Sequence, residues 1–203
     1  YLQGTDEGSY FAKNFQPLNA TGIISQSQGL GDNIPENDLT KEYETGDMRK
    51  VVSYKTYGTT PYVNKYVDLG DSQGRGGSCW IVLRYADVIL MLAEVNEALN
   101  LESEAITYID MIRTRAKLKP YDQASETYKT AYPTLKEVIL HERRIELAFE
   151  NHRWFDLLRF YKGTDLVLSS KSVQGCSKRD LLLPIPWREV SINPSGMYQN
   201  DGY

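Results

Sequence analysis

Apolar residues recur at helical spacing through the middle of the chain, and the first such stretch predicts a helix from 81 to 99. This stretch is apolar around most of its circumference, and its polar side chains form a narrow stripe: Arg84, Asp87, Glu94 and Glu97. A helix of this kind is expected to pack against neighbours on several sides. Asn100 can end it.

A second helix is predicted to begin at Glu102 and to finish near Lys117, with acidic residues at its start and basic residues at its end. This distribution complements the helix dipole. Pro120 would stop the helix. Its inner face would consist of Ala105, Tyr108, Ile109, Ile112 and Ala116. From Arg84 to Lys117 is 34 residues, the length of one tetratricopeptide-type helical hairpin.

A third helix opens with a predicted capping box, in which Thr134 and Glu137 exchange hydrogen bonds between side chain and backbone. Asn151 is expected to stop this helix in the left-handed conformation. A short helix would then carry Trp154 and Phe155 and end near Gly163. The apolar positions that predict the third helix are Leu135, Val138, Ile139, Ile145 and Phe149.

Charge is concentrated in the same apolar segment, between 142 and 159. Opposite charges stand three or four residues apart, and on a solvated helix each such pair contributes about 0.2–0.5 kcal/mol. Beside Trp154 and Phe155, we expect instead a partly buried network that fixes how two helices dock. Catalytic carboxylates are the alternative. The residues concerned are Glu142, Arg143, Arg144, Glu146, Glu150, Arg153, Asp156 and Arg159.

The first 80 residues show weaker patterns. Residues 1–46 are rich in Gly, Asn, Ser, Gln and Asp, which indicates loop, short strand or local disorder. A turn is predicted at Gly46-Asp47, and the β-branched and aromatic content from Val51 to Tyr57 predicts a short strand or hairpin. Residues 70–77 are predicted to be a flexible linker, since no strand and helix flank them with phosphate-loop spacing.

The end of the chain is again irregular. Residues 181–186 are expected to be extended, because each proline restricts the residue before it. A turn is predicted at Asn193-Pro194-Ser195-Gly196. The organisation expected is therefore a loop-rich segment with short strands (1–80), a helical core (81–163) and an extended tail packed on the helices (164–203). The fold class is mainly α, with tetratricopeptide-like helical hairpins and an irregular, loop-rich remainder.

Composition and motifs exclude several functions. The net charge of −4 gives no electrostatic case for nucleic-acid binding. No apolar run reaches the roughly 18–20 residues that cross a bilayer. His141 begins no HExxH motif, because Ile145 stands at the second histidine position, and no Gly-x-Ser-x-Gly elbow occurs. We therefore expect no catalytic residues, no metal and no cofactor. Whether Cys79 and Cys176 pair is left open by their spacing.

Three motifs stand in order along the chain. The first is RYADVILM, beginning at Arg84, and the second is ERRIELAFENHRWFDLLR, from 142 to 159. The third runs from Pro184-Ile185-Pro186 through Asn193-Pro194 to the final QNDGY. Together they resemble the SusD/RagB-like family, in which an ERRxELAFE helix is followed by G-x-R-W-F-D-L. Asn151 stands in place of the usual glycine, and Asp201 replaces the proline of QNPGY.

The resemblance implies a surface-exposed lipoprotein of the cell outer membrane, with its lipid anchor upstream of this chain. Family members are considerably longer, so the chain resembles their C-terminal portion. The implied function is to bind oligosaccharides, or peptides in some relatives, and to hand them to a SusC-type TonB-dependent transporter. Two other functions stay open: an all-helical carbohydrate-active enzyme, and a structural helical-repeat adaptor.

The resemblance also suggests where a ligand would bind. The family's ligand-contacting aromatic residues fall mainly upstream of the Arg-Tyr-Ala helix, which leaves Tyr54, Tyr57, Tyr62 and Trp80 as candidates in this chain. Aromatic faces suit sugar rings, and polar tips suit their hydroxyls. Ordinary packing is the alternative for each of the four.

Overall fold

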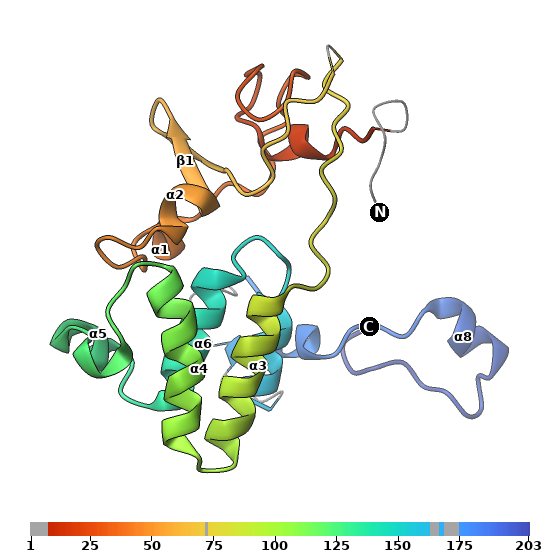
Figure 1. The fold of residues 1–203 in the computed structure, drawn as a ribbon. Helices are drawn as coiled ribbons and strands as arrows, with labels where there is room; N and C mark the ends of the chain where they lie inside the picture. The colour runs from red at the N-terminus through yellow and green to blue at the C-terminus, as the bar shows by residue number, and fades with distance from the viewer. Residues whose placement is uncertain (1–7, 72, 163–166, 169–174) are drawn as a thin grey trace. The chain divides into compact units, whose positions relative to one another are not determined.

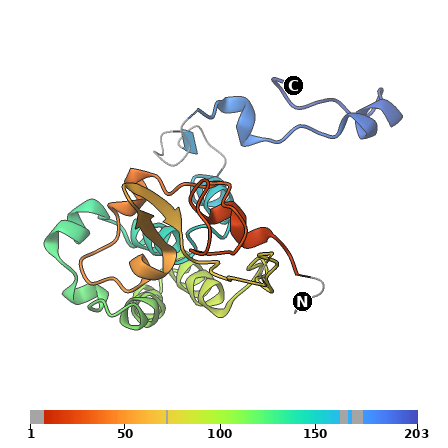
Figure 2. The ribbon, with the colours of Figure 1, turned by 90° about the horizontal axis from the view of Figure 1, so that it is seen from above.

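The chain divides into two units, Tyr1–His152 and Arg153–Tyr203, in a computed structural model that describes residues 8–71, 73–162, 167–168 and 175–203. The first unit is built on an antiparallel pair of helices, α3 (Tyr85–Ala98) and α4 (Glu102–Arg115). Figure 2 shows these helices side by side, and α6 (Leu135–Glu146) packs against both. The predicted helical hairpin and the mainly α fold class are confirmed.

The core between these helices is apolar and includes a residue from outside the hairpin. Leu90 and Ile112 are at most 1% exposed and pack with Leu147, which follows α6. The predicted inner face of α4 is confirmed at Ala105, Ile109, Ile112 and Ala116, which are all buried, whereas Tyr108 is half-buried. Full burial of a leucine or isoleucine side chain stabilises the fold by about 1.5–3 kcal/mol.

The predicted start of the first helix at 81 is wrong, because the helix begins at Tyr85. Arg84 is extended (φ −150°, ψ 158°), and its guanidinium turns toward the end of α6. The helix also buries one face rather than several. Its opposite face exposes a row of apolar residues at three- and four-residue spacing: Tyr85, Val88, Leu92, Val95 and Leu99.

The two hairpin helices end close to where Asn100 and Pro120 predicted, and a left-handed residue follows each of them. Asn100 has φ 59°, which confirms the predicted stop after α3. The second helix, α4, ends at Arg115, and Lys117 is left-handed (φ 65°), so the chain leaves the helix before Pro120.

The capping box at the start of α6 is confirmed. Thr134 Oγ1 accepts from the amide of Glu137 at 3.2 Å, and the amide of Thr134 donates to the Glu137 carboxylate at 3.0 Å. The helix ends at Glu146, earlier than the sequence predicted. Phe149 and Asn151 are both left-handed (φ 67° and 65°), so the predicted conformation of Asn151 is correct.

The amino-terminal part of the first unit is irregular but closely bonded. Its short helices are η2 (Phe11–Phe15), α1 (Asn37–Thr40) and α2 (Arg49–Ser53). The buried amide of Gln16 organises the loop after η2, accepting from three backbone amides and donating to the carbonyls of Ala20 and Ser27 at 2.7 Å. Buried polar groups are normally satisfied in this way.

A two-stranded hairpin follows α2, as predicted. Strands β1 (Tyr54–Tyr57) and β2 (Thr60–Val63) are antiparallel, with Tyr54 opposite Val63 and left-handed Gly58 in the turn. The strand begins later than predicted, because Val51 and Val52 belong to α2. The glycine-rich segment after the hairpin is packed rather than free: Gly76 pairs with Ser9, and a Cβ on Gly74 would lie 2.3 Å from the Ser27 amide.

Two short elements complete the first unit, η3 (Tyr121–Gln123) and α5 (Glu126–Ala131). The second unit contains α7 (Arg153–Phe160), η6 (Lys178–Leu181) and α8 (Trp187–Ile192), the last of which was not predicted. Phe155 on α7 is 58% exposed. The predicted end near Gly163 lies outside the described residues. None of the described helices is long and apolar enough to cross a bilayer.

The tail within the second unit is held by side-chain amides. Gln199 accepts from the amide of Ile185 at 2.7 Å and donates to its carbonyl at 2.8 Å, in the manner of a neighbouring strand. Leu181 belongs to η6, so the extended stretch is shorter than predicted. The turn at Asn193 is confirmed, since its carbonyl accepts from the amides of Gly196 and Met197.

Candidate functional site

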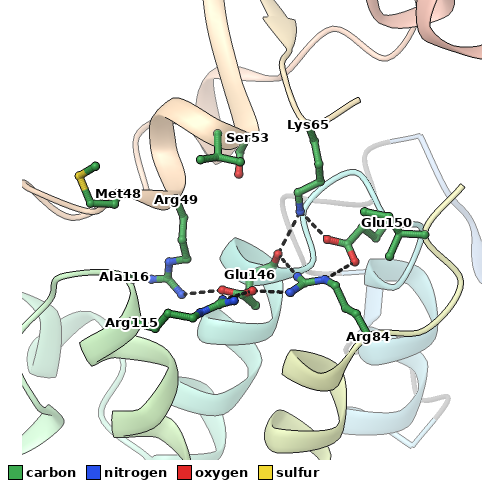
Figure 3. Close-up of a pocket in the computed structure, with 11 residues that line it drawn as sticks. Met48, Arg49, Ser53, Lys65, Arg84, Arg115, Ala116, Glu146 and Glu150 are labelled. Atoms are coloured by element: carbon green, nitrogen blue, oxygen red, sulfur yellow. Dashed lines mark hydrogen bonds and ion pairs between the residues drawn. The ribbon is translucent and has the colours of Figure 1, made fainter. Parts of the chain in front are cut away.

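A pocket of about 430 Å³ opens in the first unit where the ends of several elements meet. Figure 3 shows charged side chains from α2, from the ends of α4 and α6, and from the segments after β2 and before α3 converging on it. The residues that line the pocket are Met48, Arg49, Val52, Ser53, Lys65, Ile81, Arg84, Arg115, Ala116, Glu146 and Glu150.

Glu146 lies at the centre of the charged side chains in the pocket. Its Oε1 accepts from Nη1 of Arg84 at 2.5 Å and also from Arg115. Burial by itself would raise the pKa of Glu146, but the hydrogen bonds from Arg115 and Arg84 outweigh it and hold the pKa below its ordinary value. Glu146 is therefore an ionised carboxylate at neutral pH.

A second carboxylate, Glu150, is held in the turn that follows α6. It accepts from Nε of Arg84 at 2.7 Å and forms an ion pair with Lys65. The Lys65 ammonium also donates to the carbonyls of Glu146 (3.0 Å) and Ala148 (2.9 Å). These contacts satisfy carbonyls that the end of a helix leaves without intrahelical partners.

Behind the pocket wall, Glu142 is fully buried. It accepts from Arg113 at 2.6 Å, from Arg49 at 2.7 Å and from the Tyr128 hydroxyl at 2.9 Å. Burial would raise the pKa of Glu142, but the charges of Arg49 and Arg113 lower it to about 2. Burial and the neighbouring charge of Glu142 raise the pKa of Tyr128 well above its ordinary value, so its hydroxyl stays protonated and donates.

Among the described residues these ion pairs join into one network with equal numbers of acidic and basic groups, and the contact between Arg49 and Glu146 links its two halves. Its acidic members are Glu44, Asp47, Glu142, Glu146 and Glu150, and its basic members are Arg49, Lys65, Arg84, Arg113 and Arg115. Buried charges persist when they are paired and hydrogen-bonded in this way. The network ties α2, α4 and the segment before α3 to the end of α6.

The predicted buried network is confirmed on α6, but its partners are not those expected. The sequence suggested pairs three or four residues apart along the helix. In the structure Glu146 pairs with Arg84, 62 positions away, and Glu142 pairs with Arg49, 93 positions away. A pair at helical spacing is found on α7, between Asp156 and Arg159. His141, which begins no metal motif in the sequence, is buried and stacks on Tyr132, with ring centroids 4.1 Å apart.

The four aromatic candidates lie in different environments. Tyr54 is half-buried, and its hydroxyl donates to the carbonyl of Thr40, while Tyr57 beside the hairpin turn is 56% exposed. Tyr62 is 8% exposed and belongs to an apolar cluster. Trp80 is 41% exposed and stacks on Tyr66, with ring centroids 5.6 Å apart. Within the described residues, none of the four lines the charged pocket.

Sequence reasoning did not single out the basic side chains of the pocket as a group. Arg84 begins the RYADVILM motif and Arg115 is one of the basic residues near the end of the second helix, but neither pattern says that the two meet. Lys65 carries no periodic signal at all. Only packing brings these residues together, because they come from segments without local contact.

Chemically, the pocket offers fixed charges and hydrogen-bonding groups for a polar ligand. No group of three or more Asp, Glu, His or Cys residues suited to a metal ion occurs in the described part of the chain. The fold and this polar pocket define a class of protein: a mainly α, tetratricopeptide-type protein with a loop-rich region beside its helices.

Comparisons with known proteins place the chain more narrowly. The SusD family model matches residues 4–203. The chain is 32% identical to SusD-like protein P2 of Formosa agariphila over 234 aligned residues, which cover 100% of this chain and 46% of that protein. It is 30% identical to SusD-like protein P25 of the same organism, and the alignment covers 89% of this chain and 35% of that protein. The chain belongs to the SusD family, as its motifs suggested.

Solved structures agree on the fold. Surface glycan-binding protein A from Bacteroides thetaiotaomicron superposes with a TM-score of 0.71 at 19% identity, covering 96% of this chain and 47% of that one. A SusD superfamily protein from Bacteroides vulgatus superposes with a TM-score of 0.68 at 23% identity, covering 99% of this chain and 51% of that one. The chain thus spans about half the length of these proteins, or less.

Proposed function

We propose that this chain takes part in capturing glycans at the cell surface and in delivering them to a SusC-type TonB-dependent transporter, without chemical change to the ligand. The observation that carries the proposal is the family match across residues 4–203. The name of the surface glycan-binding protein from Bacteroides thetaiotaomicron, whose fold is similar, supports a glycan rather than a peptide as first candidate. A lipid-anchored position in the outer membrane belongs to the same proposal.

Two of the four aromatic candidates are best placed to meet a sugar. Tyr57 and Trp80 expose 56% and 41% of their surface, so a ring face is accessible without unfolding. Stacking of Trp80 on Tyr66 also fixes its orientation, which reduces the entropy lost on binding. Tyr54 and Tyr62 are more enclosed and would act by supporting the hairpin.

The test is to incubate the protein with panels of oligosaccharides and peptides and to record both retained ligand and released product by mass spectrometry. Retention of intact glycan is the expected result. Cleavage products would indicate an enzyme instead. Binding of a protein partner with no retained glycan or peptide would indicate an adaptor. Co-purification with a SusC-type transporter, in membranes that contain both proteins, tests the delivery step.

Variants locate the binding surface. W80A and Y57A are each expected to weaken glycan binding about ten-fold, since one aromatic contact contributes about 0.5–1.5 kcal/mol beyond its buried area. The matched controls are W187A and Y198A, which remove aromatic side chains that are 76% and 75% exposed in the second unit. Equal affinity in all four variants would show that the sugar binds elsewhere.

A further inference from the structure

One carboxylate oxygen in the pocket is buried without a hydrogen bond. Glu146 is 5% exposed, and its Oε2 has no hydrogen-bond partner among the described residues. Nη1 of Arg49 lies 3.7 Å away, close enough for ion pairing but too far for a hydrogen bond. A buried acceptor without a hydrogen bond raises the free energy of the folded protein. A ligand that donates a hydrogen bond to this oxygen would offset that cost.

Arg115 supplies the complementary group at the same place. Its side chain is 56% exposed, and within the described structure its Nη2 bond to Glu146 is the hydrogen bond it makes. A guanidinium carries five N–H donors, so several of them stay available to a ligand. Lys65 differs, because its ammonium already donates to three oxygens.

The charged residues that line the pocket determine which sign of ligand charge it favours. Four basic residues line it, against the two carboxylates Glu146 and Glu150. The other three acidic members of the network, Glu44, Asp47 and Glu142, do not line the pocket within the described structure. Arg49 is neutralised by Asp47 and Glu142, and Lys65 and Arg84 are paired with the two lining carboxylates. The donors left for a ligand are those of Arg115, and a guanidinium favours an anion over a neutral molecule or a zwitterion.

We propose that this pocket binds a uronic acid residue of an acidic glycan. The sugar carboxylate pairs with Arg115, and a ring hydroxyl donates to Oε2 of Glu146. The apolar side chains of Met48, Val52 and Ile81 face the C–H groups of the ring. A volume of about 430 Å³ lies within the range of about 300–1,000 Å³ typical of small-molecule sites. This inference rests on the proposed glycan binding and adds the class of sugar.

The test compares matched acidic and neutral sugars by isothermal titration calorimetry on the wild-type chain. Tri-galacturonate is expected to bind at least about ten-fold more tightly than galactotriose, because a charged hydrogen bond contributes about 1.5–3 kcal/mol. R115Q should abolish this preference, whereas R188Q, which removes an exposed arginine outside the pocket, should retain it. Circular dichroism establishes that each variant is folded.

A second variant leaves every member of the ion-pair network in the sequence. V52D adds a negative charge to a pocket residue that is 55% exposed, and it should weaken tri-galacturonate binding more than it weakens galactotriose binding. Equal affinity for the two sugars, with no effect of R115Q or V52D, would overturn the uronate site and leave glycan capture standing. Preference for a zwitterionic peptide over both sugars would also overturn it. Failure to bind any glycan would overturn the proposed function as well.

Discussion

Glu142 shows what a buried charge requires from its surroundings. It is 0% exposed, and two guanidiniums and a tyrosine hydroxyl donate to it. Removing a partner from such a site leaves a charge in a medium that solvates it poorly. The cost exceeds the value of the pair itself, because the desolvation of the remaining group is no longer offset.

We therefore expect E142Q to lower the free energy of unfolding by about 3–5 kcal/mol, because Arg49 and Arg113 lose their shared counterion. Urea denaturation followed by circular dichroism measures the change. The control is E126Q, whose side chain is 91% exposed, and it should stay within about 0.5 kcal/mol of wild type. Similar effects of the two substitutions would mean that Glu142 is not enclosed as described.

Asn151 is a position where the backbone, rather than a contact, sets the residue type. Its φ of 65° is left-handed, and its side chain is exposed. N151A should destabilise the chain by about 1 kcal/mol, because a Cβ without a polar tip disfavours this conformation. N151G removes the same amide but adopts positive φ freely, so it should be neutral or slightly stabilising. Thermal unfolding of the two variants measures both changes in stability. Equal losses of stability in N151A and N151G would contradict this explanation.

At the scale of elements, α6 is the helix to which the others of the first unit attach. Arg143 pairs with Asp87 of α3 at 2.9 Å, and Arg144 pairs with Asp38 of α1 at 2.6 Å. Glu142 and Glu146 bind the basic residues of α2 and α4. The side chains that make these contacts leave α6 in different directions, so its charged residues connect several elements at once.

The start of α6 can be tested separately from its packing. T134A removes the acceptor for the Glu137 amide and should cost about 1 kcal/mol of stability, the usual value for an N-cap. The matched control is T130A, at an exposed position in the last turn of α5, which should be neutral or slightly stabilising because alanine forms helix well. Chemical denaturation distinguishes the two, and a T134A value equal to that of T130A would argue against the cap.

At the scale of the whole molecule, the network makes the free energy of unfolding depend on pH in the acidic range. The folded pKa of Glu142, about 2, lies below its ordinary value of 4.5, and that of Glu146 is also lowered. A carboxylate whose pKa is lower in the folded protein than in the unfolded chain stabilises the fold fully at pH values above its unfolded pKa. This contribution is lost as the pH falls toward the pKa of the folded state. We expect the free energy of unfolding to fall from about pH 4.5 to about pH 2.

The acid dependence can be assigned by substitution. Urea unfolding at a series of pH values should show a steep loss for wild type and for the E126Q control. The loss should be smaller in E142Q, because its amide does not titrate in this range. A wild-type free energy that is constant from pH 5 to pH 2.5 would contradict the pairing of the buried carboxylates.

The sequence by itself determined what depends on neighbours along the chain. Helical periodicity predicted α3, α4 and α6, and the cap at Thr134 and the left-handed residues Asn100 and Asn151 follow from local backbone chemistry. The ordered motifs also identified the family. These features are readable because their interactions join residues a few positions apart.

Only the tertiary structure decided which surfaces meet. Periodicity marks the apolar positions of α3 but does not say that Leu90 is enclosed while Val95 is 52% exposed. Nor could it choose partners for Glu142 and Glu146, which lie 93 and 62 positions from Arg49 and Arg84. Many opposite charges in the chain satisfy the same electrostatic rule, and packing of the helices selects among them. The pocket exists because of that selection.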